Sequence, residues 1–474
     1  MITIPLEREG AAPLYQQLYL AIRQMIGEGS LKGGEKLPSK RALSAHLKVS
    51  IITVETAYGQ LQAEGYISSR PGSGFYVESL FPAPKRNTPA EAEAAQNAPA
   101  VFPPVKKREE RVLYNYSTSG TDVSSFPFSV WQKLSREVLS GNPRELLSPC
   151  PSSGAPRLRE AISGYLRDFR GMHVDPRQIV VGAGSEYLTG LLIQLLGRER
   201  LYGIENPGYP KIAKIFAENG AEVLPLDMDE QGLTLKGAPR LPDVLHLTPA
   251  HHFPLGVTMP AGRRSELLAK MTEKNGYIVE DDYDSEFRYK GQILPTLYSM
   301  DGGGRVICLG TFTKLLAPSL RISYMILPPA LLEEYEKRLS FYACTVPVFE
   351  QLTLALFIER GYLERHINRM KKIYKRRRDA ILAAFAASRL APHVSFTGAE
   401  AGLHLLLRTD FAQNEEELAA RAEEQGVRLT GLGGFYLTPP KKGASRAPSF
   451  LLGFTGIRDE SIPASVEALE KAWI

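Results

Sequence analysis

One lysine of this sequence stands where covalent chemistry with an aldehyde is possible. Lys314 lies in Gly310-Thr-Phe-Thr-Lys-Leu-Leu-Ala-Pro-Ser-Leu-Arg321, directly after a short apolar run that is typical of a strand. A lysine in such a setting can form a Schiff base with an aldehyde cofactor. Arg321 can clamp a phosphate through two parallel hydrogen bonds, and the hydroxyls of Thr311 and Thr313 can donate to the same group. The segment therefore predicts a cofactor that carries an aldehyde and a phosphate.

Carboxylates and a tyrosine end an earlier apolar run. The segment Val279-Glu-Asp-Asp-Tyr-Asp-Ser-Glu-Phe continues a strand predicted at 277–279. A cofactor with a pyridine ring needs a carboxylate beside its protonated ring nitrogen, because that charge keeps the ring an electron sink. One of the acids in this segment can fill that role. Tyr283 can hydrogen-bond the phenolic oxygen of the same ring.

A glycine-rich turn and a second tyrosine offer further contacts to such a cofactor. The segment Val181-Gly-Ala-Gly-Ser-Glu186 follows a predicted strand and precedes a helix predicted at 187–196. Backbone amides of Gly184 and Ser185, at the N-terminus of that helix, would cradle a phosphate. Tyr209, at the end of Glu205-Asn-Pro-Gly-Tyr209, supplies an aromatic ring for stacking on the cofactor.

Alternating strands and helices must position these residues. Short apolar runs end in Gly, Pro, Asp or Thr, which is the pattern of a mostly parallel sheet with helices between its strands. Ligands of such sheets collect at the carboxyl ends of the strands, so the segments above are expected to meet in one crevice. The clearest runs lie at 179–181, 244–247, 277–279 and 306–309.

From about residue 113 to its end, the sequence resembles the fold type I aminotransferases. The resemblance implies a large α/β domain of that fold, pyridoxal 5'-phosphate (PLP) as cofactor and Lys314 as the catalytic Schiff-base lysine. It makes Asp281, rather than Asp282, the partner of the pyridine nitrogen. The cofactor-binding residues that it implies are Lys314, Asp281, Tyr283, Tyr209, Gly184, Ser185, Thr311, Thr313 and Arg321.

Three departures, from the patterns of the aminotransferases or of related regulators, weaken an enzymatic interpretation. Phe253 stands where these enzymes usually have an asparagine beside the cofactor oxygen, and His252 stands where related regulators usually have glutamine. On the late strand at 450–455, Leu451 takes the position of the arginine that binds a substrate carboxylate. The residues left as candidates for binding an effector are Lys211, Arg446 and His252.

The first block of the chain predicts a winged helix-turn-helix. Pro13 can open an amphipathic helix that carries Leu18 and Ile22, and Ser39 and Ser50 are good N-caps for two further helices. In the helix after Ser50 we expect one buried face, formed by Val54, Ala57, Tyr58 and Leu61. The stretches 65–70 and 75–77 then read as strands joined by a turn of Pro71-Gly72-Ser73-Gly74.

Residues 10–78 resemble the GntR family of winged-helix repressors, in which the second helix of the pair lies in the major groove. Basic side chains can neutralise phosphates, and hydroxyls at helix N-termini can meet them. Ile51 and Ile52 stand where the family usually has a polar or basic pair, and they can either touch thymine methyls or pack inside. The expected DNA contacts are Lys36, Ser39, Lys40, Arg41, Ser50, Thr53, Arg70, Gly72 and Gly74.

The composition fits a protein of several domains. The chain has 474 residues, a formal net charge of +5 and three cysteines, at positions 150, 308 and 344, without metal-ligand spacing, so no metal site is expected. We expect a DNA-binding domain at 1–79, a proline-rich flexible linker at 80–112 and the PLP- and effector-binding domain at 113–474. Because the start has no signal-like apolar segment and no run is long enough to cross a bilayer, we expect a cytoplasmic protein that does not bind membranes.

With both blocks together, the whole chain resembles the MocR/GabR family of regulators. The resemblance implies a homodimer, head-to-tail and domain-swapped, that binds a double-stranded DNA operator. A small amine or amino-acid effector would be sensed through the Schiff base at Lys314, with at most partial transamination. Two alternatives stay open: a regulator that senses PLP itself to control vitamin B6 synthesis, and an active aminotransferase with an accessory DNA-binding domain.

Overall fold

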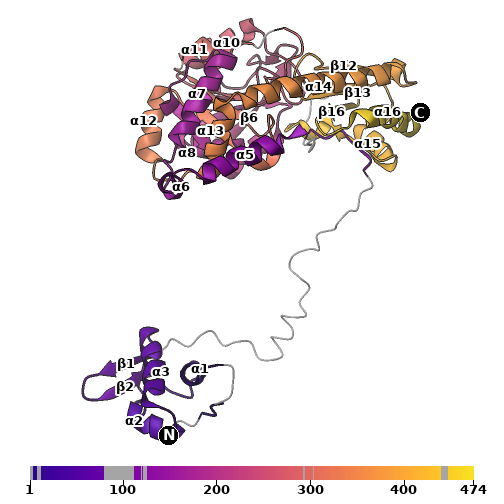
Figure 1. Cartoon of the computed structure of the whole chain (residues 1–474). Helices are drawn as coiled ribbons and strands as arrows, with labels where there is room; N and C mark the ends of the chain where they lie inside the picture. The colour runs from indigo at the N-terminus through magenta and orange to yellow at the C-terminus, as the bar shows by residue number, and fades with distance from the viewer. Residues whose placement is uncertain are drawn as a thin grey trace. The chain divides into compact units, whose positions relative to one another are not determined.

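The computed structural model describes residues 4–7, 12–79, 112–118, 120, 125–291, 294–302, 304–438 and 447–474. The chain divides into two compact units, Met1–Arg108 and Glu109–Ile474 (Figure 1). Apart from Val112, the predicted linker at 80–112 lies outside the described residues.

The small unit is a winged helix, as predicted. Each of the two serine caps accepts a hydrogen bond from a backbone amide: Ser39 from Ala42 at 3.2 Å and Ser50 from Thr53 at 3.0 Å. These bonds satisfy amides that the first helical turn leaves unpaired, and so they fix where the two helices begin. The elements are α1 (Leu14–Gly27), α2 (Lys40–Leu47), α3 (Ile51–Ala63) and the antiparallel pair β1 (Ile67–Arg70) and β2 (Gly74–Val77).

The core of the small unit lies under α3. Val54, Ala57, Tyr58 and Leu61 are all buried, as the spacing predicts. The Tyr58 hydroxyl donates to the backbone oxygen of Pro38 at 3.0 Å, which ties α3 to the segment that leads into α2. The recognition helix is therefore held rigidly against the rest of the winged helix.

The large unit is built on an eight-stranded mixed sheet in the order β4-β11-β10-β9-β8-β5-β6-β7. The neighbours from β10 to β6 run parallel, whereas β11 is antiparallel to both β10 and β4, and β7 to β6. The bounds are β4 (Ile179–Gly182), β5 (Leu201–Asn206), β6 (Glu222–Asp229), β7 (Gly232–Leu233), β8 (Val244–Leu247), β9 (Tyr277–Asp282), β10 (Val306–Thr311) and β11 (Ser323–Ile326).

Both faces of this sheet are covered, which explains the unbroken apolar runs of its strands. Neighbouring residues of one strand belong to separate hydrophobic clusters: Val180 and Val279 lie in one, Val181 and Ile278 in the other. The covering and connecting helices are α5 (Phe128–Leu139), α6 (Pro143–Leu147), α7 (Pro156–Arg170), α8 (Ser185–Leu196), α9 (Pro210–Glu218), α10 (Ala261–Glu273), α11 (Leu297–Asp301), α12 (Pro329–Arg338) and α13 (Val348–Glu359).

The C-terminal part of the large unit has its own antiparallel sheet, in the order β12-β13-β16-β15. The long helix α14 (Tyr362–Ala386) leads into it, and α15 (Glu415–Glu424) and α16 (Ile462–Trp473) pack beside it (Figure 1). The strands are β12 (Val394–Thr397), β13 (His404–Thr409), β15 (Thr430–Gly431) and β16 (Ser449–Gly453), and β3 (Tyr114–Asn115) pairs with β14 (Val427–Arg428). Across the described residues, no helix combines the length and apolar character that a membrane span requires.

Candidate functional site

Lys314 lies in the loop that follows β10, and its side chain is half-buried. Its ammonium nitrogen donates to the backbone oxygen of Thr118 at 3.0 Å. Burial lowers the pKa of Lys314, against the opposing influence of Asp284. A lysine must be neutral to attack a carbonyl carbon, so this environment favours the reactive form of the amine.

The three acids at the end of β9 have different surroundings. Glu280 accepts hydrogen bonds from the backbone amides of Leu297 at 2.9 Å and Tyr298 at 3.1 Å, and so it holds the start of α11. Asp282 forms an ion pair of 2.5 Å with Arg170, the last residue of α7. These two acids serve the packing between β9 and its neighbouring helices.

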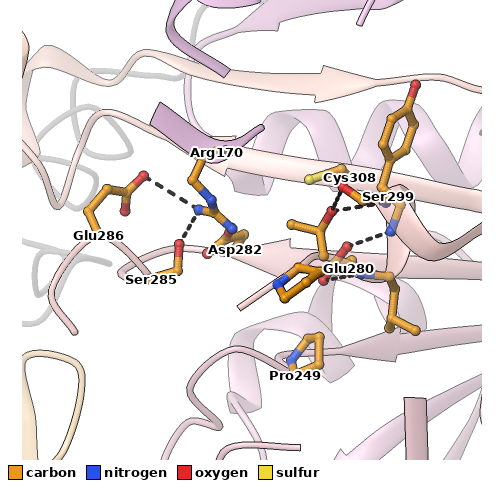
Figure 2. Close-up of polar contacts among 12 residues, drawn as sticks. Arg170, Pro249, Glu280, Asp282, Ser285, Glu286, Ser299 and Cys308 are labelled. Carbon is orange, nitrogen blue, oxygen red and sulfur yellow. Dashed lines mark hydrogen bonds and ion pairs between the residues drawn. The ribbon is translucent and has the colours of Figure 1, made fainter. Parts of the chain in front are cut away.

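Figure 2 shows how the guanidinium of Arg170 is surrounded. Beside Asp282, it contacts the hydroxyl of Ser285 and lies 3.8 Å from a carboxylate oxygen of Glu286. Glu286 also accepts a hydrogen bond of 2.6 Å from the hydroxyl of Tyr165. The nearly buried carboxylate of Asp282 thus has a cationic partner, which offsets part of the cost of burying it.

Asp281 points to the other face of the sheet, where it has no such partner among the described residues. Its side chain is 15% exposed, and one of its carboxylate oxygens lies 3.8 Å from Nε2 of His246. Burial, and the charges of Asp282 and Asp284, raise its pKa to about 7. A cation placed beside Asp281 would lower that pKa, and a protonated pyridine nitrogen is such a cation.

Tyr283 is fixed by a buried histidine. Its hydroxyl donates to the backbone oxygen of His251 at 3.0 Å, and Nδ1 of the same histidine lies 3.0 Å from Asp284. No sequence pattern predicts this pair, because Asp284 looks like one more acid at a strand end. The pair orients Tyr283 and places a buried charge close enough to act on Lys314.

An anion-binding corner lies at the N-terminus of α8. Gly184 has a φ of 100°, and a Cβ there would fall against Nη2 of Arg321 and 2.9 Å from its Cζ. The carboxylate of Glu186 accepts from Lys211 at 2.6 Å and from Arg321 at 3.2 Å. Ser185 is the first residue of the helix. Two cations converge here on a carboxylate beside a helix N-terminus, and the same cations suit a phosphate.

The other predicted cofactor contacts are Thr311 and Thr313 at the end of β10 and Tyr209 before α9. The hydroxyl of Thr311 accepts from Ser323 at 2.8 Å and from the amide of Thr313 at 3.1 Å, so its loop is well ordered. Tyr209 caps α9, is 42% exposed and lies edge-on to Phe253 at 5.8 Å between ring centres. A reactive amine, a buried acid, a ring and an anion corner therefore border one end of the sheet, and this set of donors fits PLP.

The structure describes two of the three candidate effector contacts, Lys211 and His252. Lys211 lies in the anion corner, paired with Glu186. His252 is buried 3.6 Å from Glu205, and burial lowers its pKa to about 3, so it is neutral. Arg446 lies outside the described residues. In the parts of the chain that the structure covers, no cluster of three or more His, Cys, Asp or Glu side chains could hold a metal ion.

In the small unit, the structure places the predicted DNA contacts around α2, α3 and the wing. Ile51 and Ile52, 47% and 73% exposed, lie in the first turn of α3 instead of packing inside. Lys40 forms an ion pair of 2.5 Å with Glu55, and the guanidinium of Arg70 lies 4.3 Å from the Tyr76 ring centre. Lys36, Arg41, Ser39, Ser50 and Thr53 lie on or beside these helices, and Gly72 and Gly74 form the wing turn with positive φ.

Comparisons with known proteins agree with both halves of this description. Residues 14–77 match the family model described as bacterial regulatory proteins, gntR family. The chain is 39% identical to the uncharacterized HTH-type transcriptional regulator YdeL of Bacillus subtilis, over 100% of this chain and 99% of the relative. It is 32% identical to the probable rhizopine catabolism regulatory protein MocR of Rhizobium meliloti, over 99% and 95% of the two chains.

Two further comparisons concern the large unit. The chain is 32% identical to the pyridoxine biosynthesis transcriptional regulator PdxR of Corynebacterium glutamicum, over 89% of this chain and 88% of that one. Among solved structures, a multiple substrate aminotransferase from Thermococcus profundus superposes with a TM-score of 0.67 at 26% identity, covering 79% of this chain and 95% of the other. The large unit therefore has the aminotransferase fold.

Proposed function

Because this chain belongs to the MocR-type family of transcriptional regulators, which join a GntR helix-turn-helix to an aminotransferase-like domain, we propose that it binds PLP and senses a small amine or amino acid. Aminotransferases of this fold depend on PLP, and the site has a suitable donor set. The observation that best supports this proposal is the contrast between Asp281 and Asp282 at the end of β9. Asp282 is paired with Arg170, whereas Asp281 is nearly buried without a cationic partner among the described residues.

In this proposal each group has one task. Lys314 holds PLP covalently, Asp281 faces the ring nitrogen and Tyr209 covers the ring. Tyr283 donates to the phenolic oxygen once its hydroxyl turns away from the backbone oxygen of His251, its acceptor in the structure. The phosphate lies in the anion corner, held by Arg321 and by the segment of Gly184 and Ser185 at the N-terminus of α8. The hydroxyls of Thr311 and Thr313 are further donors to it. Bound PLP would supply an aldehyde carbon that reacts reversibly with primary amines, and this chemistry makes the site selective for them.

We also propose a homodimer, head-to-tail, as the form that binds an operator. Large apolar side chains are exposed on α5, α6 and the segment before α13, among them Leu147 at 80% and Phe341 at 76%. Clusters of such residues mark protein interfaces. An effector that favours one arrangement of the dimer shifts the operator affinity by its differential affinity for the two arrangements.

Reduction with borohydride tests the covalent part of the proposal. After incubation with PLP and reduction, a peptide digest should carry the mass adduct at Lys314, and Lys314→Ala should carry none. Lys211→Ala is the matched control, because it removes a lysine of the same site and should keep the adduct. A digest without an adduct at Lys314 in the wild-type protein contradicts the proposal.

A second candidate function is a regulator for which PLP itself is the signal. The likeness to PdxR favours it, since that relative is named for control of pyridoxine biosynthesis. A DNA duplex selected by the protein from a random pool separates the two functions. PLP alone changes its binding if PLP is the signal, whereas an added amine is needed if PLP serves as the sensor.

A further inference from the structure

Apolar and aromatic side chains border the candidate site beside Tyr209 and Tyr283. Phe253 is their centre: its ring lies 5.8 Å from Tyr209, 6.3 Å from Tyr283 and 5.2 Å from Phe435, measured between ring centres. Leu255, Leu406, Leu432, Tyr436 and Leu451 pack into the same hydrophobic cluster. We call Phe253, Leu255, Phe435 and Tyr436, which are only partly buried, the apolar wall.

In and beside the wall lie two positions at which aminotransferases usually have polar side chains, one beside the cofactor oxygen and one at the substrate carboxylate. Phe253 replaces the asparagine, and Leu451 on β16 replaces the late-strand arginine. Leu451 is fully buried and lies opposite Leu406 of β13 and Thr430 of β15, so the sheet itself packs an apolar side chain there. Both substitutions exchange a polar group for one that cannot pair with an anion.

The cations of the described site are engaged elsewhere. Lys211 and Arg321 share the carboxylate of Glu186 in the anion corner, although the ammonium of Lys211 also lies 6.0 Å from the ring centre of Tyr209. His404, which packs on Phe253 at 5.3 Å, places its Nε2 3.0 Å from the backbone oxygen of Pro254, and burial keeps its pKa well below the usual range. A carboxylate against the wall would lose hydration without gaining a charged partner from the described residues.

We infer that the effector is a primary amine with an aromatic or branched alkyl body and no carboxylate beside the amino group. This inference rests on the proposed function, because the amino group is recognised by PLP on Lys314. The apolar body packs against Phe253 and Phe435, where each buried carbon adds to affinity. The amine is therefore of the class that decarboxylation of an amino acid produces, and the amino acid itself is discriminated against.

Matched pairs of ligands test the inference, because the members of each pair differ only in the carboxylate. The PLP-loaded full-length protein is titrated with 2-phenylethylamine against L-phenylalanine and with 3-methylbutylamine against L-leucine. The change in absorbance of bound PLP and isothermal calorimetry report the Kd. In each pair the amine should bind at least about tenfold more tightly, which corresponds to about 1.4 kcal/mol.

Two substitutions assign the preference to the wall. Phe253→Asn should reduce the discrimination between the members of a pair to about threefold or less, whereas Phe253→Leu should retain most of it. Phe411→Asn is the matched control: Phe411 is also partly buried among aromatic rings, His393 and Trp473, but takes no part in the site. It should leave both Kd values unchanged.

The outcomes distinguish a failure of this inference from a failure of the proposed function on which it rests. If PLP binds at Lys314 but amino acids bind as tightly as their amines, or neither ligand binds, the inference is wrong and PLP binding stands. If the reduced protein carries no adduct at Lys314, the proposed function itself is wrong. If Phe253→Asn fails to fold, the wild-type pairs and Phe253→Leu still decide the question.

Discussion

Replacing Gly184 by alanine should weaken PLP binding through a single added methyl group. Gly184 precedes α8 with φ 100° and ψ 159°, a region that only glycine occupies readily. Holding alanine there costs about 1–3 kcal/mol of backbone strain. The new Cβ would also meet the guanidinium of Arg321, 2.9 Å from its Cζ, so Arg321 must move away from the anion corner.

The size of the effect follows from what Arg321 would lose. A hydrogen bond to a charged group contributes about 1.5–3 kcal/mol. Losing one at the phosphate would raise the Kd for PLP about 10- to 150-fold. If displacement of Arg321 is the cause, then combining Gly184→Ala with Arg321→Ala should add little to Arg321→Ala alone, because both changes remove one contact.

Gly190 provides a matched control in the same helix. A Cβ at Gly190 has no neighbour within 4 Å, so Gly190→Ala should leave PLP binding unchanged and stabilise the protein by about 0.5–1 kcal/mol. The measurements are a PLP titration by absorbance and denaturant unfolding of the protein without PLP. A wild-type Kd for Gly184→Ala would refute the assignment of this corner to the phosphate.

Three further predictions concern single side chains. Burial raises the pKa of Glu205 from 4.5 to about 8, so the folded protein retains a proton that the unfolded chain releases, and this group lowers stability as pH rises between those values. Glu205→Gln should make urea unfolding less dependent on pH in that range, and an unchanged slope would contradict the burial argument. Glu186→Gln releases Lys211 and Arg321 from their shared carboxylate and should raise PLP affinity severalfold in the same titration, whereas weaker binding would show that Glu186 supports the site. Ile52→Asn, at a side chain 73% exposed, should change stability by no more than about 0.5 kcal/mol but alter the sequence selected from random DNA duplexes, and an unaltered selection would argue against base contact by Ile52.

Local signals allowed much of the fold to be predicted. The caps Ser39 and Ser50 fix the starts of α2 and α3, because a serine hydroxyl that accepts from an amide three residues later acts within one turn. The runs that became β4, β8, β9 and β10 were equally clear, since buried strands of a covered sheet are apolar throughout. The antiparallel insertion of β11 between β4 and β10 depends on pairing across the chain, and nothing in its own sequence indicates it.

The candidate site was harder to predict from the sequence where contacts between distant segments determine the surroundings of a side chain. Lys211 follows Tyr209 closely in sequence, but its ion pair with Glu186 depends on a residue 25 positions earlier and no local pattern indicates it. His252 is buried beside Glu205, and no local pattern distinguishes such a histidine from an exposed one. Whether Ile51 packs or is exposed is decided by how α3 docks on the rest of the winged helix.

The three acids of β9 show how a strand can both build a fold and serve a site. Alternation sends Glu280 and Asp282 to one face, where Glu280 accepts from amides of α11 and Asp282 pairs with Arg170, and Asp281 to the other. His246, beside Asp281, is neutral because burial lowers its pKa to about 4, so it cannot supply the missing charge. A carboxyl in that position binds a proton near pH 7 or exchanges it for another cation. Asp281 can therefore still take a cationic partner, whereas Glu280 and Asp282 already hold neighbouring helices in place.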